Sequence, residues 1–297
     1  MNELDICSYA KINIGLYVLE QLEDGYHKII TLFQQIDLCD KLKFIRTNNS
    51  MNIRSHHPGV PRGEDNLIWK AFRLFKNKCS INGGLNVYLE KRIPVGAGLA
   101  GGSSNAAVTL LAANKLWNEP LTRSELLDLA NQLGADVPFF IFGISAIGRG
   151  KGEILEKIHY DKNWWIVLVC PEIFISTKWV YNQTKFILTK IKKITNFSTL
   201  FENFDSNTLQ DNIMNELEGI VFKRYPILEQ IKAQLKEMGA FYVSMSGSGS
   251  SVYALYKERK HAEKVKQFFA IEKEMRTFLC KPLSVYPYSS LLNDEYR

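Results

Sequence analysis

A stretch of glycines and serines at residues 94–107, PVGAGLAGGSSNAA, carries the clearest chemical signal of the chain. It places four glycines within seven residues, followed by two serines. Glycine leaves backbone N–H groups open to a ligand and adopts a positive φ at no steric cost. An apolar, helix-prone run follows up to Trp117. Because a glycine loop that opens onto a helix N-terminus binds anions, above all phosphate, the stretch predicts a site for a phosphate-bearing ligand.

The glycine spacing does not match the familiar phosphate loops. A P-loop requires Lys after its second glycine, where Gly102 stands here. The dinucleotide pattern is formally met by Gly96, Gly98 and Gly101, but another helical segment follows where a βαβ unit needs a strand. The protein-kinase loop needs HRD and DFG segments downstream, which the sequence lacks. A mere turn rarely needs so many glycines, so a phosphate cradle of another kind is favoured.

A second glycine-serine segment, SMSGSGSS at residues 244–251, has hydroxyl and N–H groups that suit anionic oxygens. Alone, it is equally well explained as a flexible hairpin turn. Its interest comes from the first loop, because a phosphoryl-transfer site must hold donor and acceptor together.

Several polar side chains permit either a structural or a chemical interpretation. Lys11 and Asn13 lie on the polar face of a predicted strand, which is either a solvated face or a cation held near a carboxylate or phosphate. Asp136 precedes VPFF, so it is an N-cap for a short helix, a base that accepts a hydroxyl proton, or both. Tyr26 and His27 follow a turn, where they are either exposed or contact the ring and edge of a base.

Composition bounds the class of protein. The 297 residues, 46% hydrophobic and 23% charged, suit a globular protein of one large or two smaller domains. A net charge of +6 fits an anionic small substrate as well as weak nucleic-acid attraction. Five scattered cysteines without C-x-x-C indicate reduced thiols rather than disulfides or zinc. The N-terminus is unlike a signal peptide and the apolar runs are too short for a bilayer, so a cytoplasmic protein is expected.

Periodicity predicts an α+β fold that positions these residues. Strands are expected at 6–18 with one buried face, 29–36, 42–47, 85–89, 164–170, 240–245, 252–256 and 279–285. Helices are expected at 66–78, 103–117, 122–133, 207–222, 225–238 and 259–269, the third with the capping-box spacing of Thr122 and Glu125. Residues 145–154 contain GRGKGE, which predicts a basic turn. A junction near residue 160 would divide the chain into domains 1–160 and 161–297.

Five motifs in order resemble the GHMP kinases, a superfamily named for galactose, homoserine, mevalonate and phosphomevalonate. The glycine loop carries the general resemblance, although Ala100 stands where many members have glycine, a change that the loop should tolerate. SYAKINIGLYV, DGYH, GADVPFF and SGSGSSVY narrow it to the branch that phosphorylates a cytidine-diphosphate-linked methylerythritol in the non-mevalonate route to isoprenoids. The similarity spans residues 8 to about 255. It implies an N-terminal half like domain 2 of ribosomal protein S5, a C-terminal α/β half, and a site in the cleft between them.

The resemblance also implies roles for individual residues in phosphoryl transfer from ATP to the acceptor's 2-hydroxyl. Asp136 matches the catalytic base, and Lys11 the lysine that favours its ionised form and orients the acceptor. Asn13 matches a substrate contact, Tyr26 and His27 the cytosine-recognising pair. The second stacking aromatic would be Tyr181. Residues implied to hold the ATP phosphates are Pro94, Val95, Gly96, Ala97, Gly98, Leu99, Ala100, Gly101, Gly102, Ser103 and Ser104. Those implied to close the acceptor side are Gly247, Ser248, Gly249 and Ser250.

Mg²⁺ is expected to arrive with ATP, since phosphoryl transfer depends on positioning and charge neutralisation. Its protein ligands are not specified by the sequence: Asp136 is the one clear acidic candidate, and Ser103 or Ser104 offers a hydroxyl.

Two other functions compete. A kinase of the same superfamily for another alcohol, such as mevalonate or homoserine, would not need the base-reading pair Tyr26 and His27. A non-catalytic nucleotide- or RNA-binding protein is suggested by the implied S5-like half and by a basic stretch, but Lys11 and Asp136 argue against it. The lysines of that stretch are Lys185, Lys190, Lys192 and Lys193. Small-molecule partners are therefore expected, with neither nucleic acid nor membrane, and oligomeric state is not specified.

Overall fold

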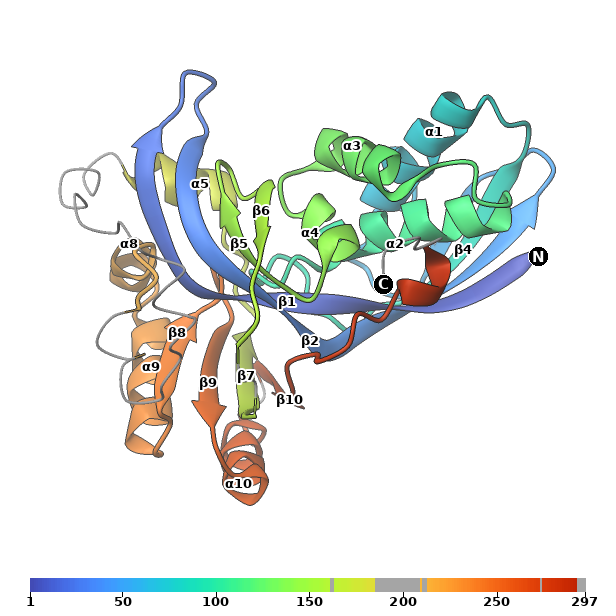
Figure 1. Ribbon diagram of the computed structural model, residues 1–297. Coiled ribbons are helices and arrows are strands. Elements are labelled where there is room, and N and C mark those ends of the chain that lie inside the picture. Colours follow the sequence, from blue (N-terminus) through green and yellow to red (C-terminus); the bar gives the residue numbers. More distant parts are fainter. Residues whose placement is uncertain (161–162, 185–208, 210–212, 273, 293–297) are drawn as a thin grey trace.

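The computed structural model describes residues 1–160, 163–184, 209, 213–272 and 274–292, which form two β-sheets flanked by helices (Figure 1). The first sheet has the order β3-β4-β2-β5-β6, with β1 also paired to β2, and the second has the order β10-β7-β9-β8. Mixed sheets with segregated helices confirm the predicted α+β class.

The first sheet is built on a long antiparallel pair, β1 (Glu3–Gln21) and β2 (His27–Thr47). The predicted strands 29–36 and 42–47 are thus one continuous strand. The prediction of a single buried face for 6–18 is wrong for residues 10–18, every one of which is buried. The apolar side chains of Ile12 and Ile14 face the core of the second sheet. Lys11 and Asn13 instead face a cleft whose walls shield them from solvent.

Burial on both faces therefore extends from residue 10 to residue 18 without a break, Gly15 included. The helical layer and the second sheet cover this part of β1 from opposite sides, and this sandwiching could not be read from the alternation of polar and apolar residues. The polar side chains on it are consequently held in fixed positions at the cleft.

Helices cover one face of the first sheet (Figure 1). They are α1 (Leu67–Cys79), α2 (Gly101–Leu116), α3 (Arg123–Leu133) and α4 (Val137–Phe142). The predicted helices 66–78, 103–117 and 122–133 are confirmed to within two residues, including the capping box of Thr122 and Glu125. Helix α2 is buried on nearly all sides, which its run of alanine and leucine allows. It contacts β1 and the other three helices, so its N-terminus has a fixed place at the cleft.

Three short strands were not predicted, and two of them flank the predicted basic turn. Residues 145–154 contain β5 (Ser145–Arg149), and β6 (Ile154–Lys157) begins at their end, so only the four residues between them form the turn. Strand β3 (Asn52–Ser55) pairs in parallel with β4 (Gly84–Glu90).

The second sheet contains β7 (Trp165–Pro171), β8 (Tyr242–Met245), β9 (Val252–Tyr256) and β10 (Met275–Cys280). Helices α9 (Pro226–Glu237) and α10 (Arg259–Phe269) pack on it, as predicted, while α5 (Thr177–Asn182) and α8 (Glu218–Arg224) lie nearby (Figure 1). The predicted helix 207–222 is wrong for residues 213–217, which form a bridge and a turn; 207, 208 and 210–212 lie outside the described residues. The lysines at 185, 190, 192 and 193 lie outside them as well.

The last predicted strand, 279–285, coincides with β10 at its first two residues and is wrong for 281–285, because β10 ends at Cys280 and the chain then crosses to the first sheet. Leu283 N donates to Gln35 O at 2.9 Å, and the Tyr288 hydroxyl donates to Cys7 O at 3.0 Å. The domain division near residue 160 stays a prediction. In the part of the chain that the structure describes, no helix is long and apolar enough to cross a membrane.

Candidate active site

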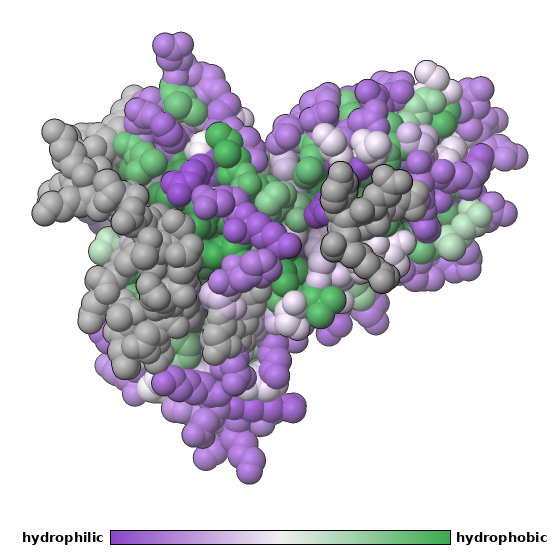
Figure 2. Space-filling model, viewed as in Figure 1, coloured by the Kyte–Doolittle hydropathy of each residue, from purple (hydrophilic) through white to green (hydrophobic). Residues whose placement is uncertain are grey.

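A cleft of about 1100 Å³ is lined by residues from β1, β2, α5 and both glycine segments. Figure 2 shows the surface hollowed between the arm formed by the β1–β2 hairpin and the arm formed by the helices of the first sheet. Almost all of the residues singled out in the sequence line this one cleft. Among the residues to which the resemblance assigns a site role, the three that do not are Leu99, Ser104 and Ser250.

The first glycine loop presents an uncapped helix N-terminus to the cleft. Helix α2 begins at Gly101, and the preceding residue, Ala100, makes no side-chain capping bond. Ala100 has a φ of 52°, in the left-handed region that glycine adopts more easily, so its methyl group carries a steric cost at this position. The first turn carries no acidic residue. Free N–H groups and the positive end of a 16-residue helix thus converge on one place, which suits phosphate.

The two glycine segments are joined to each other. A Cβ on Gly98, whose φ is +76°, would lie 2.0 Å from Ser246 O, so only glycine fits this contact. The Ser246 hydroxyl donates to Gly98 O at 2.9 Å, and Ser251 N donates to Ala97 O at 3.2 Å. The second segment is therefore a fixed wall of the cleft rather than a flexible turn.

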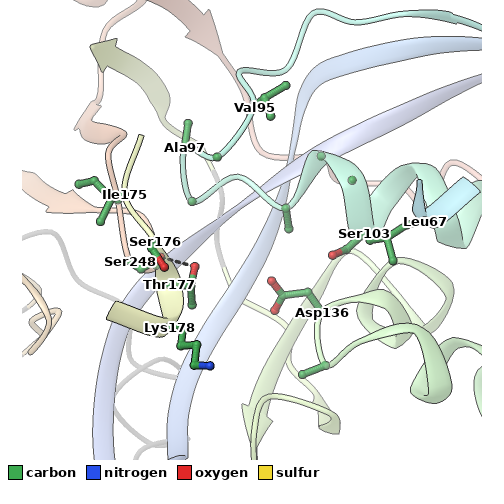
Figure 3. Close-up of a pocket in the computed structure, with 18 of the residues that line it drawn as sticks. Leu67, Val95, Ala97, Ser103, Asp136, Ile175, Ser176, Thr177, Lys178 and Ser248 are labelled. Atoms are coloured by element: carbon green, nitrogen blue, oxygen red, sulfur yellow. Dashed lines mark hydrogen bonds between the residues drawn. The ribbon is translucent and has the colours of Figure 1, made fainter. Parts of the chain in front are cut away.

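The predicted loop residues that do not line the cleft have structural contacts instead. Leu99 is buried in the core, and the Ser104 hydroxyl hydrogen-bonds the Ser8 hydroxyl at 2.6 Å. Ser250 is buried, and its hydroxyl donates to Pro171 O at 3.4 Å. Of the two helix-start serines, Ser103 is the one that reaches the cleft (Figure 3).

Lys11 and Asp136 meet in the cleft although 125 positions separate them in the chain. Lys11 Nζ lies 3.6 Å from Asp136 Oδ2 and donates to Asn13 Oδ1 at 2.6 Å. Burial lowers the pKa of Lys11, because the ammonium loses its hydration, and the Asp136 carboxylate opposes that shift. The Asn13 amide donates to Thr31 Oγ1 at 3.0 Å, which directs its oxygen toward Lys11.

Asp136 directly precedes α4, yet its side chain makes no capping bond. That side chain is 36% exposed and lines the cleft (Figure 3). The N-cap interpretation therefore does not account for the carboxylate, which remains accessible to a ligand.

Aromatic side chains stand at another part of the cleft. The rings of His27 and Tyr181 lie 5.4 Å apart with 31° between their planes. Tyr26 is 61% exposed, and Lys151 Nζ lies 4.4 Å from the centroid of its ring while pairing with Asp24. An exposed tyrosine, a buried histidine and a half-buried tyrosine lining one part of a cleft suit a planar heterocycle.

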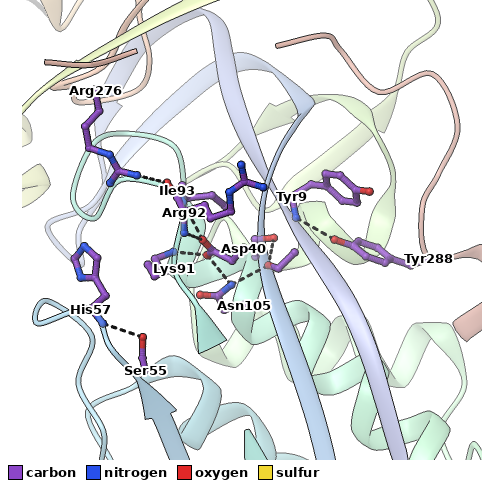
Figure 4. Close-up of polar contacts among 12 residues, drawn as sticks. Tyr9, Asp40, Ser55, His57, Lys91, Arg92, Ile93, Asn105, Arg276 and Tyr288 are labelled. Carbon is purple, nitrogen blue, oxygen red and sulfur yellow. Dashed lines mark hydrogen bonds and ion pairs between the residues drawn. The ribbon is translucent and has the colours of Figure 1, made fainter. Parts of the chain in front are cut away.

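Sequence reasoning missed a buried polar cluster behind the loop (Figure 4). The Asp40 carboxylate on β2 accepts bonds from Lys91 Nζ, from Arg92 N and Ile93 N at 2.8 and 2.9 Å, and from Asn105 Nδ2 at 3.0 Å. It thereby ties both ends of the glycine loop to the first sheet. Phe174, Lys151 and Lys178, which line the cleft, were missed too. The one local signal was the position of Lys91 in the short segment that leads from β4 into the loop.

Comparison with known proteins agrees with this geometry. The family model for the GHMP kinases N terminal domain matches residues 66–144, and that for the GHMP kinases C terminal domain matches residues 193–273. A protein of Alkaliphilus metalliredigens named 4-diphosphocytidyl-2-C-methyl-D-erythritol kinase is 40% identical over 89% of this chain and 91% of its own. A crystal structure of 4-(cytidine 5'-diphospho)-2C-methyl-D-erythritol kinase, 30% identical, superposes with a TM-score of 0.79 over 94% of this chain and 99% of that one.

A homoserine kinase from Cytophaga hutchinsonii shares the fold, with 19% identity and a TM-score of 0.72 over 95% of each chain. The predicted two-part GHMP kinase fold is confirmed, and the chain is a small-molecule kinase of the GHMP class, whose members use ATP as phosphoryl donor. Within that class it belongs to the family of the 4-diphosphocytidyl-2-C-methyl-D-erythritol kinases.

Proposed function

We propose that this protein transfers the γ-phosphoryl group of ATP to the 2-hydroxyl of 4-diphosphocytidyl-2-C-methyl-D-erythritol, in the non-mevalonate route to isoprenoid precursors. The observation that supports it most is the Lys11–Asp136 pair, 3.6 Å apart, in the same cleft as both glycine segments and the aromatic rings. The names of the relatives supply the acceptor's identity.

In the proposed reaction Asp136 acts as the general base. The acceptor's 2-hydroxyl oxygen forms a bond to the γ-phosphorus, the bond from that phosphorus to the β–γ bridging oxygen breaks, and ADP leaves. Asp136 takes the hydroxyl proton and returns it to solvent through its exposed side. The ammonium of Lys11 favours the ionised carboxylate and orients the acceptor hydroxyl, and Asn13 holds Lys11 in place.

The ATP phosphates would bind at the α2 N-terminus, along the predicted loop residues that line the cleft. Among the described residues no three His, Cys, Asp or Glu side chains are grouped as metal ligands. Mg²⁺ nevertheless fits here, because it is commonly held by one or two protein oxygens plus phosphate, and Ser103 and Asp136 offer such oxygens. When bound, Mg²⁺ would neutralise charge on the transferred phosphoryl group.

The cytosine would bind among the aromatic side chains. Tyr26 and Tyr181 offer ring faces on which a pyrimidine can stack, and His27 offers a hydrogen bond to its edge. Gly247, Ser248 and Gly249 would close the acceptor side.

A coupled assay of ADP release tests the proposal. Purified protein with ATP and Mg²⁺ is given the cytidyl alcohol, mevalonate or homoserine at equal concentrations. Turnover should be highest by far with the cytidyl alcohol. Faster turnover of mevalonate or homoserine, or none of the cytidyl alcohol by folded protein, overturns the assignment.

A further inference from the structure

The cleft contains four lysines, which differ in their charge partners. Three of them face a carboxylate: Lys11 faces Asp136, Lys91 faces Asp40 and Lys151 faces Asp24. Lys178 is exposed, and among the described residues no carboxylate oxygen lies within 4.0 Å of its Nζ. A positive charge that the protein leaves uncompensated inside a binding cleft is suited to an anionic part of a ligand.

The position of Lys178 in the cleft indicates which anionic part of the ligand it would contact. Lys178 and Tyr181 are three residues apart on α5 and therefore project from the same side of the helix. The hydroxyls of Thr177 and Ser248 hydrogen-bond at 2.9 Å, which fixes the start of α5 against the second glycine segment. Figure 3 shows the Lys178 side chain extending from α5 into the cleft on the side that holds Asp136.

The proposed acceptor carries a diphosphate between its cytidine and its methylerythritol. With the base against Tyr181 and the reacting hydroxyl at Asp136, the diphosphate must span the region between them, whereas the donor's phosphates occupy the α2 N-terminus. We propose that Lys178 binds the acceptor's diphosphate and is a specificity-determining residue for acceptors that carry one. This inference rests on the proposed function for the identity of the ligand.

Steady-state kinetics of Lys178→Gln, which keeps the stem and removes the charge, test the proposal. We expect the KM for the acceptor to rise about tenfold, the loss of one hydrogen bond to a charged group, while the KM for ATP stays within twofold. Lys178→Arg should restore most of the affinity. The matched control is Lys223→Gln on α8, an exposed lysine outside the cleft, which should leave both KM values unchanged. An unchanged acceptor KM in Lys178→Gln, or an equal rise for ATP, overturns the proposal.

Calorimetric titration with CDP and with cytidine separates this proposal from the proposed function, because it needs no turnover. The wild-type protein should bind CDP more tightly than cytidine, and Lys178→Gln should weaken CDP about tenfold and leave cytidine unchanged. Equal weakening of both ligands points to a disturbed helix and overturns the role of Lys178. Failure of turnover in the wild type, with the CDP effect intact, overturns the proposed reaction alone.

Discussion

Two lysine–aspartate pairs line or back the same cleft, and they are built differently. Lys91 with Asp40 and Lys11 with Asp136 each join a lysine to a carboxylate distant in the chain. In both pairs burial lowers the lysine pKa and the carboxylate opposes the shift. The two sites therefore share their residue types and the main influences on the lysine.

The carboxylates make the difference. Asp40 is wholly buried, and its two oxygens accept from two backbone N–H groups, one amide and one ammonium. Asp136 is 36% exposed, has no capping bond and lies 3.6 Å from its lysine. A carboxylate saturated with donors holds structure, whereas one with free lone pairs at a cleft can take a proton.

The largest expected effect comes from Asp136→Asn, which removes the base and keeps the shape. We expect kcat to fall roughly 10²- to 10⁴-fold, the usual range for a general base. The melting temperature should change little, because the carboxylate is partly solvated and makes no capping bond. ADP release and a thermal melt measure the two quantities. Turnover close to that of the wild type would remove Asp136 from the role of base.

Asp40→Asn should invert that pattern. Breaking a buried charge pair by changing one partner costs about 3–5 kcal/mol, which for a chain of this size is a fall of roughly 10 °C in melting temperature. Because Asp40 ties the glycine loop to the sheet, the KM for ATP should rise more than kcat falls. Asp128→Asn, an exposed aspartate on α3, is the control. A melting temperature and ATP KM equal to those of this control would show that the buried pair does not hold the loop.

The contrast between these two sites also shows which structural features local sequence patterns can predict. The helix after the glycine loop and the capping box of Thr122 and Glu125 were predictable, since local spacing determines them. Asp40 carries no such signal, because every donor to it lies more than 50 positions away. The pairing of Lys11 with Asp136 was expected from the family resemblance, not from any pattern in the residues.

Errors in the predicted elements have the same origin. Residues 279–285 have a strand-like composition, but Leu283 bonds to Gln35 across the molecule, and such a contact has no local trace. A solvated face stayed one of the two interpretations of Lys11, because polar alternation does not reveal that a second layer covers the strand. Contacts with segments distant in the chain thus explain the wrongly predicted strand, and they also determine the burial on which the chemistry of the site depends.

The smallest expected effect is a shift in the pH profile, and it tests whether Lys11 acts as a charge. Its folded-state pKa is lowered by burial, so it loses its proton below the usual value of about 10.4. Between the lowered folded-state pKa and the unfolded-state pKa of Lys11, the unfolded chain binds more protons than the folded one, so this group makes the stability rise with pH. Activity falls over the same pH range, because the ammonium is lost. Lys11→Arg keeps the charge and should move the alkaline limb of kcat/KM to higher pH, with a lower kcat because the guanidinium is larger.

Lys28→Arg, at an exposed lysine paired with Glu20, is the control for this variant and should keep the wild-type pH profile. An unmoved limb in Lys11→Arg would mean that another group titrates there, and the contrast between the two pairs would then rest on their carboxylates alone.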